Sequence, residues 1–332
     1  MLKSVIIGFG GIAKAAHVPN WKILEEKGLG RLVACYDIDA SQFLKTQVLN
    51  IGSGAGADNL CTYTEIEELL EKETPDVADI CAPTPAHAQI AADLLRRGIH
   101  VHCEKPMART FEQCQEMIDA AKQSGAKLMI GQCLRFFAPY VFLKDALKKD
   151  AFGKPHSAMF QRLSAPPTWG WDNWFMDGER SGGCLLDLHI HDLDALRFIF
   201  GEPGAVSCVT KNVFSGDDIV HSRLLYDDLA VLAIGDWSLS GYNFEAGYRV
   251  GFEKATVVFN NGEVTVFPCE GEPWKPELSD ESMYMKELEY FLSVVIPGGE
   301  NTINTPESAS QTVRLAEVLK QSAGQNGAIL PY

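Results

Sequence analysis

The sequence has 332 residues, which is long for one hydrophobic core and predicts two domains. Its formal net charge of −15 excludes the basic face that a nucleic acid or an anionic membrane would need, so we expect neither partner. No apolar run approaches the roughly 20 residues of a membrane span. The chain enters an apolar strand directly after Met1, so no signal peptide is expected. The nine cysteines contain no CxxC pair, which is typical of buried thiols in a reducing cytoplasm.

The first third alternates between strand and helix patterns. Short apolar, β-branched runs predict buried strands, and the segments between them carry helical periodicity. The expected strands are 3–8, 31–36, 77–81, 99–103 and 127–131, and the expected helices are 11–27, 64–73, 86–97 and 110–124. Thr64 and Glu67 have the spacing of a capping box at the start of the second helix. This alternation predicts an α/β domain with a doubly wound parallel sheet.

The pattern changes after about residue 150 and becomes rich in strands. The expected strands lie near 156–163, 205–213, 219–226, 229–237, 246–253, 255–260 and 263–267, with Asn260-Asn261-Gly262 as a hairpin turn. A Trp/Pro-rich loop covers 165–180, and helices are expected at 183–200, 281–294 and 306–322. We therefore expect a Rossmann domain over 1–132 and an α+β domain with a large, mostly antiparallel open sheet over 133–332. The C-terminal helix could pack back on the first domain.

A glycine loop follows the first strand and opens the first helix. It consists of Gly8, Phe9, Gly10, Gly11, Ile12 and Ala13, which fits G-x-G-x-x-G/A. The first glycine permits a tight turn, the second lets the backbone approach a pyrophosphate, and the small last residue lets helix and strand pack closely. The N–H groups at the helix start would face the pyrophosphate. The loop therefore predicts a dinucleotide cofactor.

An acid at the end of the second strand indicates which dinucleotide is preferred. Asp37 can accept hydrogen bonds from the ribose hydroxyls of NAD, but it would repel the 2′-phosphate of NADP. The next residues are Ile38 and Asp39, so no arginine follows to offset that repulsion. We therefore expect NAD as the cofactor, with NADP less favoured.

Two further positions suggest acid–base chemistry. His191 and Asp187 are four residues apart, which places them on one face of a continuous helix, and Asp194 would extend that stripe. The remaining side chains of this helix are mostly apolar, so the helix is buried and its polar stripe must face partners or a cleft. Lys105 follows an apolar strand at the carboxyl edge of the parallel sheet, where ligands bind in such folds. We interpret His191 as a general base. We interpret Lys105 as a cation that can stabilise negative charge developing on a substrate oxygen.

Several motifs together carry a family resemblance. They are Pro83-Thr84-Pro85-Ala86-His87, Glu104-Lys105-Pro106, Gly131-Gln132-Cys133-Leu134-Arg135-Phe136, and the run from Ser181 through Asp187 and His191 to Asp194. In this order they resemble the glucose–fructose oxidoreductase, inositol dehydrogenase and MocA (Gfo/Idh/MocA) family of oxidoreductases. Two positions depart from it: Pro85 stands where the family usually has Asn, and His189 where it often has Gly.

The resemblance implies hydride transfer between a nicotinamide and a carbinol carbon of a sugar, cyclitol or related polyol. Lys105, Asp187 and His191 map onto the family's catalytic positions. Contacts to the cofactor are expected from Pro83, Thr84, His87, Glu104 and Lys105, and contacts to the substrate from Arg135, Trp174 and His189. Trp169 and Trp171 could join Trp174 in an aromatic wall for a sugar ring, with core packing or an oligomer interface as the alternatives. The resemblance also implies a homodimer or homotetramer. The run Ala230-Val231-Leu232-Ala233-Ile234 supports this, since it predicts a strand with two apolar faces that need cover.

Three alternatives remain at the level of the sequence. His189-Ile190-His191-Asp192 resembles a metal-ligand run, but a helix separates the two imidazoles by about 200°, so we expect no metal. A non-enzymatic NAD sensor would keep the glycine loop without needing Lys105, Asp187 and His191. Some relatives keep NAD tightly bound and break glycosidic bonds by transient oxidation, and the sequence is compatible with that chemistry.

Overall fold

The structure, a computed structural model, describes residues 1–45, 48–49, 52–53, 56–57, 59–260 and 262–332. The chain forms two compact units. The first unit contains residues 1–133 and 281–310, and the second contains residues 134–280 and 311–332. The sequence places residues 281–310 in the second domain, whereas in the structure they pack with the first unit.

The first unit is built on a parallel sheet, as the sequence predicts, but the sheet has six strands because β5, at residues 61–63, was not among the five expected. Its strands are β1 (Leu2–Ile7), β2 (Gly30–Tyr36), β5 (Cys61–Tyr63), β6 (Val77–Ile80), β7 (His100–Glu104) and β8 (Leu128–Gly131). Their order across the sheet is β5-β2-β1-β6-β7-β8. The order reverses between β1 and β6, which is where doubly wound sheets bind their ligands. The glycine loop follows β1 and therefore lies at this reversal.

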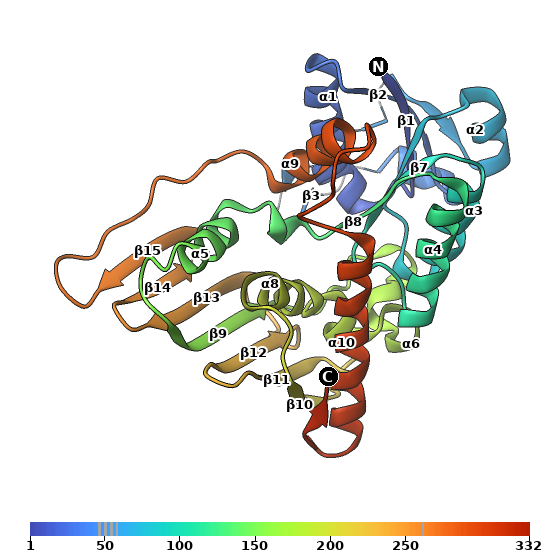
Figure 1. The fold of residues 1–332 in the computed structure, drawn as a ribbon. Coiled ribbons are helices and arrows are strands. Elements are labelled where there is room, and N and C mark those ends of the chain that lie inside the picture. Colours follow the sequence, from blue (N-terminus) through green and yellow to red (C-terminus); the bar gives the residue numbers. More distant parts are fainter. Residues whose placement is uncertain (46–47, 50–51, 54–55, 58, 261) are drawn as a thin grey trace. The chain divides into compact units, whose positions relative to one another are not determined.

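Helices α1 (Val18–Glu26), α2 (Ile66–Glu73), α3 (Thr84–Arg96) and α4 (Phe111–Ser124) connect these strands (Figure 1). The helix expected over 11–27 starts with a π-helical turn, η1 (Ala13–His17). Pro19 follows this turn and has no N–H to continue the α-helical ladder, which accounts for the irregular start. The capping box at Thr64 does not form. Helix α2 instead begins after Glu65, whose side chain makes no capping hydrogen bond.

Two C-terminal segments complete the core of the first unit. Helix α9 (Met283–Tyr290) and the π-helical turn η5 (Phe291–Val295) carry Leu288, Phe291, Leu292 and Val295, and all four are buried. They belong to the same hydrophobic cluster as Trp21 and Leu24 of α1. This apolar contact explains why residues 281–310 group with the Rossmann sheet.

The second unit contains an eight-stranded, mostly antiparallel sheet, as expected. Its strands are β9 (Pro155–Leu163), β10 (Ala205–Lys211), β11 (Ile219–Leu225), β12 (Ala230–Asp236), β13 (Glu245–Phe252), β14 (Ala255–Asn260), β15 (Glu263–Pro268) and β16 (Leu330–Pro331). Their order is β15-β14-β13-β9-β12-β11-β10-β16, and β9 and β12 run parallel. Asn260 pairs with Glu263, so β14 and β15 are joined by a two-residue connection. Asn261 of the predicted turn lies outside the described residues.

One face of this sheet is covered and the other carries exposed apolar side chains. Helices α5 (Ala138–Lys148) and α8 (Ile190–Phe200) lie over the covered face, where Phe160, Tyr248 and Phe259 are buried (Figure 1). The sequence interpretation missed α5, although Tyr140, Leu143 and Ala146 recur at helical spacing and are buried. On the opposite face, Val209 and Leu232 keep 52% and 36% of their surface exposed.

The helix expected over 183–200 is interrupted. Helix α7 (Gly183–Asp187) ends at Asp187, Leu188 and His189 form a turn, and α8 begins at Ile190. The amides of both turn residues bond to the carbonyl of Cys184, which shifts the register between the two helices. The single-helix geometry assumed for Asp187 and His191 is therefore wrong. Along the chain, the short helix α6 (Gly178–Ser181) comes before α7, and helix α10 (Pro306–Gly324) comes after α9 and η5.

Candidate active site

The glycine loop has the geometry that a bound pyrophosphate requires. Gly8 has φ +92°, and a Cβ there would lie 2.5 Å from the amide nitrogen of Ala82, so only glycine fits at this turn. A Cβ on Gly10 would meet no heavy atom within 4 Å, so that side of the loop is open to a ligand. Ala13 is fully buried where the helix packs on the sheet. Gly11 and Ile12 begin the helix, so their N–H groups belong to its N-terminal turn.

Asp37 is held in place at the end of β2. Its Oδ2 accepts a hydrogen bond of 2.8 Å from the Phe9 amide, and its Oδ1 accepts one of 2.9 Å from the Asp39 amide. Burial raises the pKa of Asp37, while these two backbone hydrogen bonds act in the opposite direction. Each carboxylate oxygen still has a second lone pair. The geometry therefore leaves Asp37 able to accept a hydrogen bond from a ribose hydroxyl.

Lys14, which the sequence interpretation did not single out, supports the loop next to Asp37. Its side chain is buried, and its Nζ donates to the carbonyl oxygens of Gln42 (2.6 Å) and Lys45 (2.8 Å). Burial lowers the pKa of Lys14, although the charge of Asp37 opposes the shift. A lysine one turn after a glycine loop would face solvent in most helices, so no local pattern indicates this role.

The segment Glu104-Lys105-Pro106 is held from two sides. The Lys105 amide donates to Glu104 Oε2 at 3.0 Å. The ring nitrogens of His87 lie 2.9 Å from the carbonyl oxygen of Pro106 and 2.7 Å from that of Ala82. Lys105 itself is half-buried at the carboxyl edge of β7. The backbone on which the candidate catalytic lysine stands is therefore fixed by neighbouring side chains.

His87 was expected to contact the cofactor, and its geometry argues against that role. The residue is 1% exposed, and both ring nitrogens face backbone carbonyls. Burial also lowers its pKa, which disfavours a charged ring. Pro83 and Thr84 form the start of α3 next to it, with Pro83 half-buried and Thr84 buried. We assign His87 to bracing the loop between Ala82 and Pro106 instead.

In the second unit, Asp187 and His191 stand on either side of the break between α7 and α8. Both are half-buried, whereas most of the neighbouring residues of these helices are buried. The turn at Leu188 and His189 changes the helical phase, but both polar side chains still reach the accessible surface of the unit. The pair could therefore act on a ligand placed against this unit.

Asp194 does not extend this pair, contrary to expectation. Its carboxylate accepts two hydrogen bonds from Arg135, 2.8 Å from Nε and 2.7 Å from Nη2, and a third from the hydroxyl of Thr312 at 2.8 Å. Arg135 is 4% exposed and was expected to bind substrate. Its guanidinium is oriented toward Asp194, so a structural role replaces that expectation. Asp192 accepts two similar bonds, from Arg162 of β9.

His189 was also expected to contact substrate, but it lies in the interior of the second unit. It is 0% exposed, and its Nε2 lies 2.7 Å from Ser222 Oγ of β11. A Cβ on Gly235 would come within 2.9 Å of His189, so the ring fills the space above a glycine. Burial and the nearby charge of Arg162 lower its pKa to about 3. The turn between α7 and α8 directs this ring away from solvent.

Of the three tryptophans considered as a sugar-stacking wall, the loop exposes two and buries Trp174, the one expected to contact substrate. Trp174 is 8% exposed and packs on Phe175, with ring centroids 4.1 Å apart. Trp169 and Trp171 are 53% and 39% exposed. The aromatic surface available to a ligand is therefore that of Trp169 and Trp171, and Trp174 packs inside the loop.

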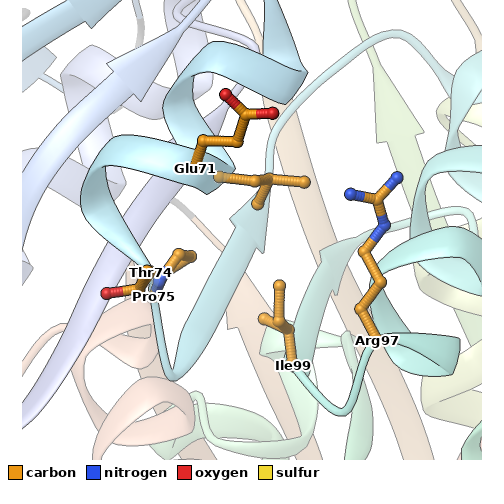
Figure 2. A pocket seen from close by; sticks show the side chains of 6 residues that line it. Glu71, Thr74, Pro75, Arg97 and Ile99 are labelled. Atoms are coloured by element: carbon orange, nitrogen blue, oxygen red, sulfur yellow. The ribbon is translucent and has the colours of Figure 1, made fainter.

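A separate cleft of about 330 Å³ lies on the first unit. It is lined by Leu70, Glu71, Thr74, Pro75, Arg97 and Ile99 (Figure 2). Thr74 and Pro75 precede β6, and Ile99 precedes β7, so the cleft lies at the amino edge of the sheet. The glycine loop lies at the carboxyl edge. This cleft is therefore distinct from the candidate cofactor site.

Among the residues that the structure describes, one group has the spacing of metal ligands. It consists of His17, Asp79 and Cys81, whose potential ligand atoms lie within 4.8 Å of one another. His189 and His191 are not part of it. The same described residues contain no helix long and apolar enough to cross a membrane.

The fold and the glycine loop define a protein with an NAD-binding Rossmann domain. Residues 2–132 match the NAD-binding Rossmann fold of the Gfo/Idh/MocA oxidoreductase family. Residues 140–258 match the C-terminal domain of the same family. The chain belongs to the Gfo/Idh/MocA family of oxidoreductases, as the sequence motifs indicated.

Relatives with known names act on sugars and cyclitols. The 1,5-anhydro-D-fructose reductase of Ensifer adhaerens is 27% identical over 279 residues, which covers 80% of this chain and 83% of that protein. The myo-inositol 2-dehydrogenase of Thermotoga maritima is 30% identical over 199 residues, covering 59% of this chain and 54% of that protein. A levoglucosan dehydrogenase solved with NADH and levoglucosan shares the fold, with a TM-score of 0.83, 19% identity and 99% coverage of both chains.

Proposed function

We propose that this oxidoreductase is an NAD-preferring dehydrogenase acting on a carbinol carbon of a sugar, cyclitol or related polyol. The observation that carries the proposal is the pair Asp187 and His191, which stays accessible at the junction of two otherwise buried helices. An acid and a histidine that stay accessible between buried helices are available to a ligand, which favours a site at this position. The named relatives support the substrate class.

Each catalytic side chain has one role in this proposal. Bound NAD supplies the hydride acceptor. His191 is the general base that removes the proton of the substrate hydroxyl. Asp187 favours the imidazolium that His191 then becomes. Lys105 donates to the substrate oxygen and stabilises its developing negative charge.

Cofactor preference follows from Asp37. The amides of Phe9 and Asp39 orient its carboxylate, which accepts hydrogen bonds from the ribose hydroxyls of NAD. A 2′-phosphate at the same position would meet a fixed negative charge. NADP is therefore the weaker ligand. The remaining cofactor contacts come from the glycine loop, Pro83 and Thr84.

The substrate meets an aromatic surface. Trp169 and Trp171 expose large ring areas, and the apolar face of a sugar or cyclitol ring packs well on such rings. We propose these two side chains, in place of Trp174, as substrate contacts.

The outer face of the second sheet is proposed as a homo-oligomer interface. Ala230, Leu232 and Ile234 alternate along β12 on the side opposite the buried Val231 and Ala233. Such an apolar sheet face needs cover, and a second copy of the same face supplies it with twofold symmetry. Sedimentation at micromolar concentration should show a dimer or larger species, and a stable monomer would contradict this interface.

The test of the activity is a substrate screen. Purified protein is incubated with NAD and a panel of inositols, aldoses and sugar acids, and absorbance at 340 nm is followed. We expect reduction of NAD with at least one member of the panel. A parallel incubation with p-nitrophenyl glycosides and no added NAD tests the glycosidase alternative. Release of p-nitrophenol together with no NADH formation would replace the dehydrogenase proposal.

A further inference from the structure

A cluster of ionisable side chains is buried inside the first unit. It contains His17 from η1, Asp79 from β6, His102 and Glu104 from β7, and Glu287 from α9, and none is more than 5% exposed. Charged groups are almost never buried this deeply unless they are paired. Of these residues, only Glu104 touches the segment assigned to catalysis above. The arrangement of the other four therefore needs an explanation.

His17 joins the two carboxylates. Its Nδ1 lies 2.7 Å from Asp79 Oδ2, and its Nε2 lies 3.0 Å from Glu104 Oε1. A neutral imidazole has one N–H, so only the imidazolium can donate to both carboxylates. Burial opposes that charge, but the negative charge of Asp79 prevails and raises the pKa of His17 well above its usual value.

Asp79 anchors the far end of this bridge. Besides His17, it accepts hydrogen bonds from Trp21 Nε1 at 2.8 Å and from His102 Nδ1 at 2.8 Å. Burial acts to raise its pKa, but the charge of His17 and these hydrogen bonds hold the pKa below the usual range. Three donors on two oxygens fix the carboxylate rigidly. His17 is therefore oriented from a site inside the core.

Glu104 transmits this orientation to the catalytic segment. One oxygen, Oε1, faces His17, and the other, Oε2, accepts the amide of Lys105 at 3.0 Å. The side chain lies over Gly131 of β8, where a Cβ would be 3.2 Å from Oε1. A continuous chain of contacts thus runs from Asp79 through His17 and Glu104 to the backbone of Lys105.

We propose that His17 is a positioning residue, which orients Lys105 by clamping Glu104 between its own imidazolium and the Lys105 amide. This rests on the proposed function, in which Lys105 stabilises the substrate oxygen. A displacement of about 1 Å at a catalytic group can cost about 100-fold in rate. The bridge would prevent such a displacement.

A metal ion is the competing explanation for the cluster, because His17, Asp79 and Cys81 have ligand spacing. The ring nitrogens of His17 already face Asp79 and Glu104 at hydrogen-bond distance, which favours protons as the bridge. Metal analysis of the purified protein separates the two. One equivalent of a tightly held metal that needs His17 would overturn the proposal.

The decisive experiment is a double-mutant cycle between His17→Gln and Lys105→Met. We expect His17→Gln to lower kcat roughly 10- to 100-fold, with NAD affinity changed by less than about twofold. On the Lys105→Met background the same change should lower kcat by less than about threefold, since the lysine it orients is absent. Equal losses on both backgrounds would mean a merely structural role and overturn the proposal.

His102→Gln is the matched control. His102 has the same depth and the same partner, Asp79, but the structure places no hydrogen bond between it and Glu104. It should lower the melting temperature as His17→Gln does. Because a glutamine amide at position 102 can still donate to Asp79, the effect on kcat should be smaller than that of His17→Gln and the same with or without Lys105. If Lys105→Met alone keeps full activity, the role of Lys105 in the proposed function fails first. That result differs from equal losses of kcat on both backgrounds, which would contradict only the positioning role of His17.

Two measurements keep the test decisive if His17→Gln does not fold. Gly131→Ala pushes on Glu104 without removing a buried charge, and it should reproduce the loss of kcat and its dependence on Lys105. In the wild-type protein, ¹⁵N NMR of labelled histidines should show both nitrogens of His17 protonated at pH 8. A neutral His17 at that pH would overturn the clamp.

Discussion

Two histidines, His17 in the first unit and His189 in the second, are both 0% exposed, yet they are held in opposite charge states. His17 lies between the carboxylates of Asp79 and Glu104, and its pKa is raised well above the usual value. His189 contacts the hydroxyl of Ser222, and burial together with Arg162 lowers its pKa to about 3. Depth alone therefore does not set the charge of a buried histidine, and the partners decide it.

The difference follows from where the two units place their acids. In the first unit, Asp79 and Glu104 lie on neighbouring parallel strands whose carboxyl ends meet at one sheet edge, next to the start of the first helix. In the second unit, Asp192 and Asp194 of α8 are already neutralised by Arg162 and Arg135. His189 is thus left without a carboxylate. The buried charged residues of the first unit lie next to the segment Glu104-Lys105-Pro106. Those of the second unit hold helix α8 in place.

The largest expected effect separates His191 from its buried neighbour. His191→Ala should lower kcat roughly 10²- to 10⁴-fold because the general base is lost. His189→Ala should instead lower the melting temperature and leave kcat much less affected, since its ring packs against Gly235 and Ser222. Steady-state kinetics at saturating NAD, with calorimetry for NAD binding, measures both. An inactive His189→Ala beside an active His191→Ala would reverse the assignment.

Next in size is the buried ion pair of the second unit. Arg135→Met leaves Asp194 buried without its charged partner, which costs about 3–5 kcal/mol of unfolding free energy. Arg97→Met is the control, because its pair with Glu67 is solvent-exposed and should contribute little to stability. Urea unfolding gives both values. Arg135→Met with wild-type stability and a raised KM would instead support substrate binding by Arg135.

The sequence predicted the architecture well because its signals are local. The glycine loop, the apolar strands and the Asn-Gly turn each depend on a few neighbouring residues. The parallel order of the first sheet then follows from the alternation of strands and helices. Helix α5 was missed although its apolar spacing is present, and the break at Leu188 leaves no mark in the composition.

The site was harder to predict because its partners are distant in sequence. The sequence identified Asp37, Lys105, Asp187 and His191 as candidates, and the structure leaves all four at least partly accessible. Arg135 and Asp194 are 59 residues apart, and His17 and Glu104 are 87 apart, so no local pattern pairs them. Polar residues inside apolar strands, as Asp79 and His102 are, were the local signs of the buried cluster.

The comparison of the two histidines predicts opposite dependences of stability on pH. His17 has a raised folded-state pKa, so its contribution is complete below its unfolded pKa of about 6.5 and is lost as pH rises through the folded value. His189 has a folded-state pKa of about 3, so its contribution is complete above about 6.5 and is lost as pH falls. Within each window the slope is on the order of 1 kcal/mol per pH unit.

Urea unfolding of the wild type, His17→Gln and His189→Gln between pH 5 and 9 measures these slopes. The stability penalty of His17→Gln should be larger at pH 6 than at pH 9. The penalty of His189→Gln should be larger at pH 8 than at pH 5. Parallel curves for both variants would contradict the assigned charge states.

The smallest expected effect concerns the cofactor. Asp37 is held by the amides of Phe9 and Asp39, so its negative charge is fixed where the ribose hydroxyls of NAD would lie. Asp37→Ser removes the charge and keeps a hydrogen-bonding group. The substitution should weaken NAD binding and narrow the difference in affinity between NAD and NADP by about tenfold, or ~1.4 kcal/mol.

Asp39→Ser is the matched control, since Asp39 lies two residues further and its side chain caps the short η2 turn (Ala40–Phe43). Calorimetric titration with both cofactors gives the two affinities. Wild-type protein that binds NADP more tightly than NAD would contradict this account of Asp37, and so would an Asp39→Ser variant that narrows the gap as much as Asp37→Ser does.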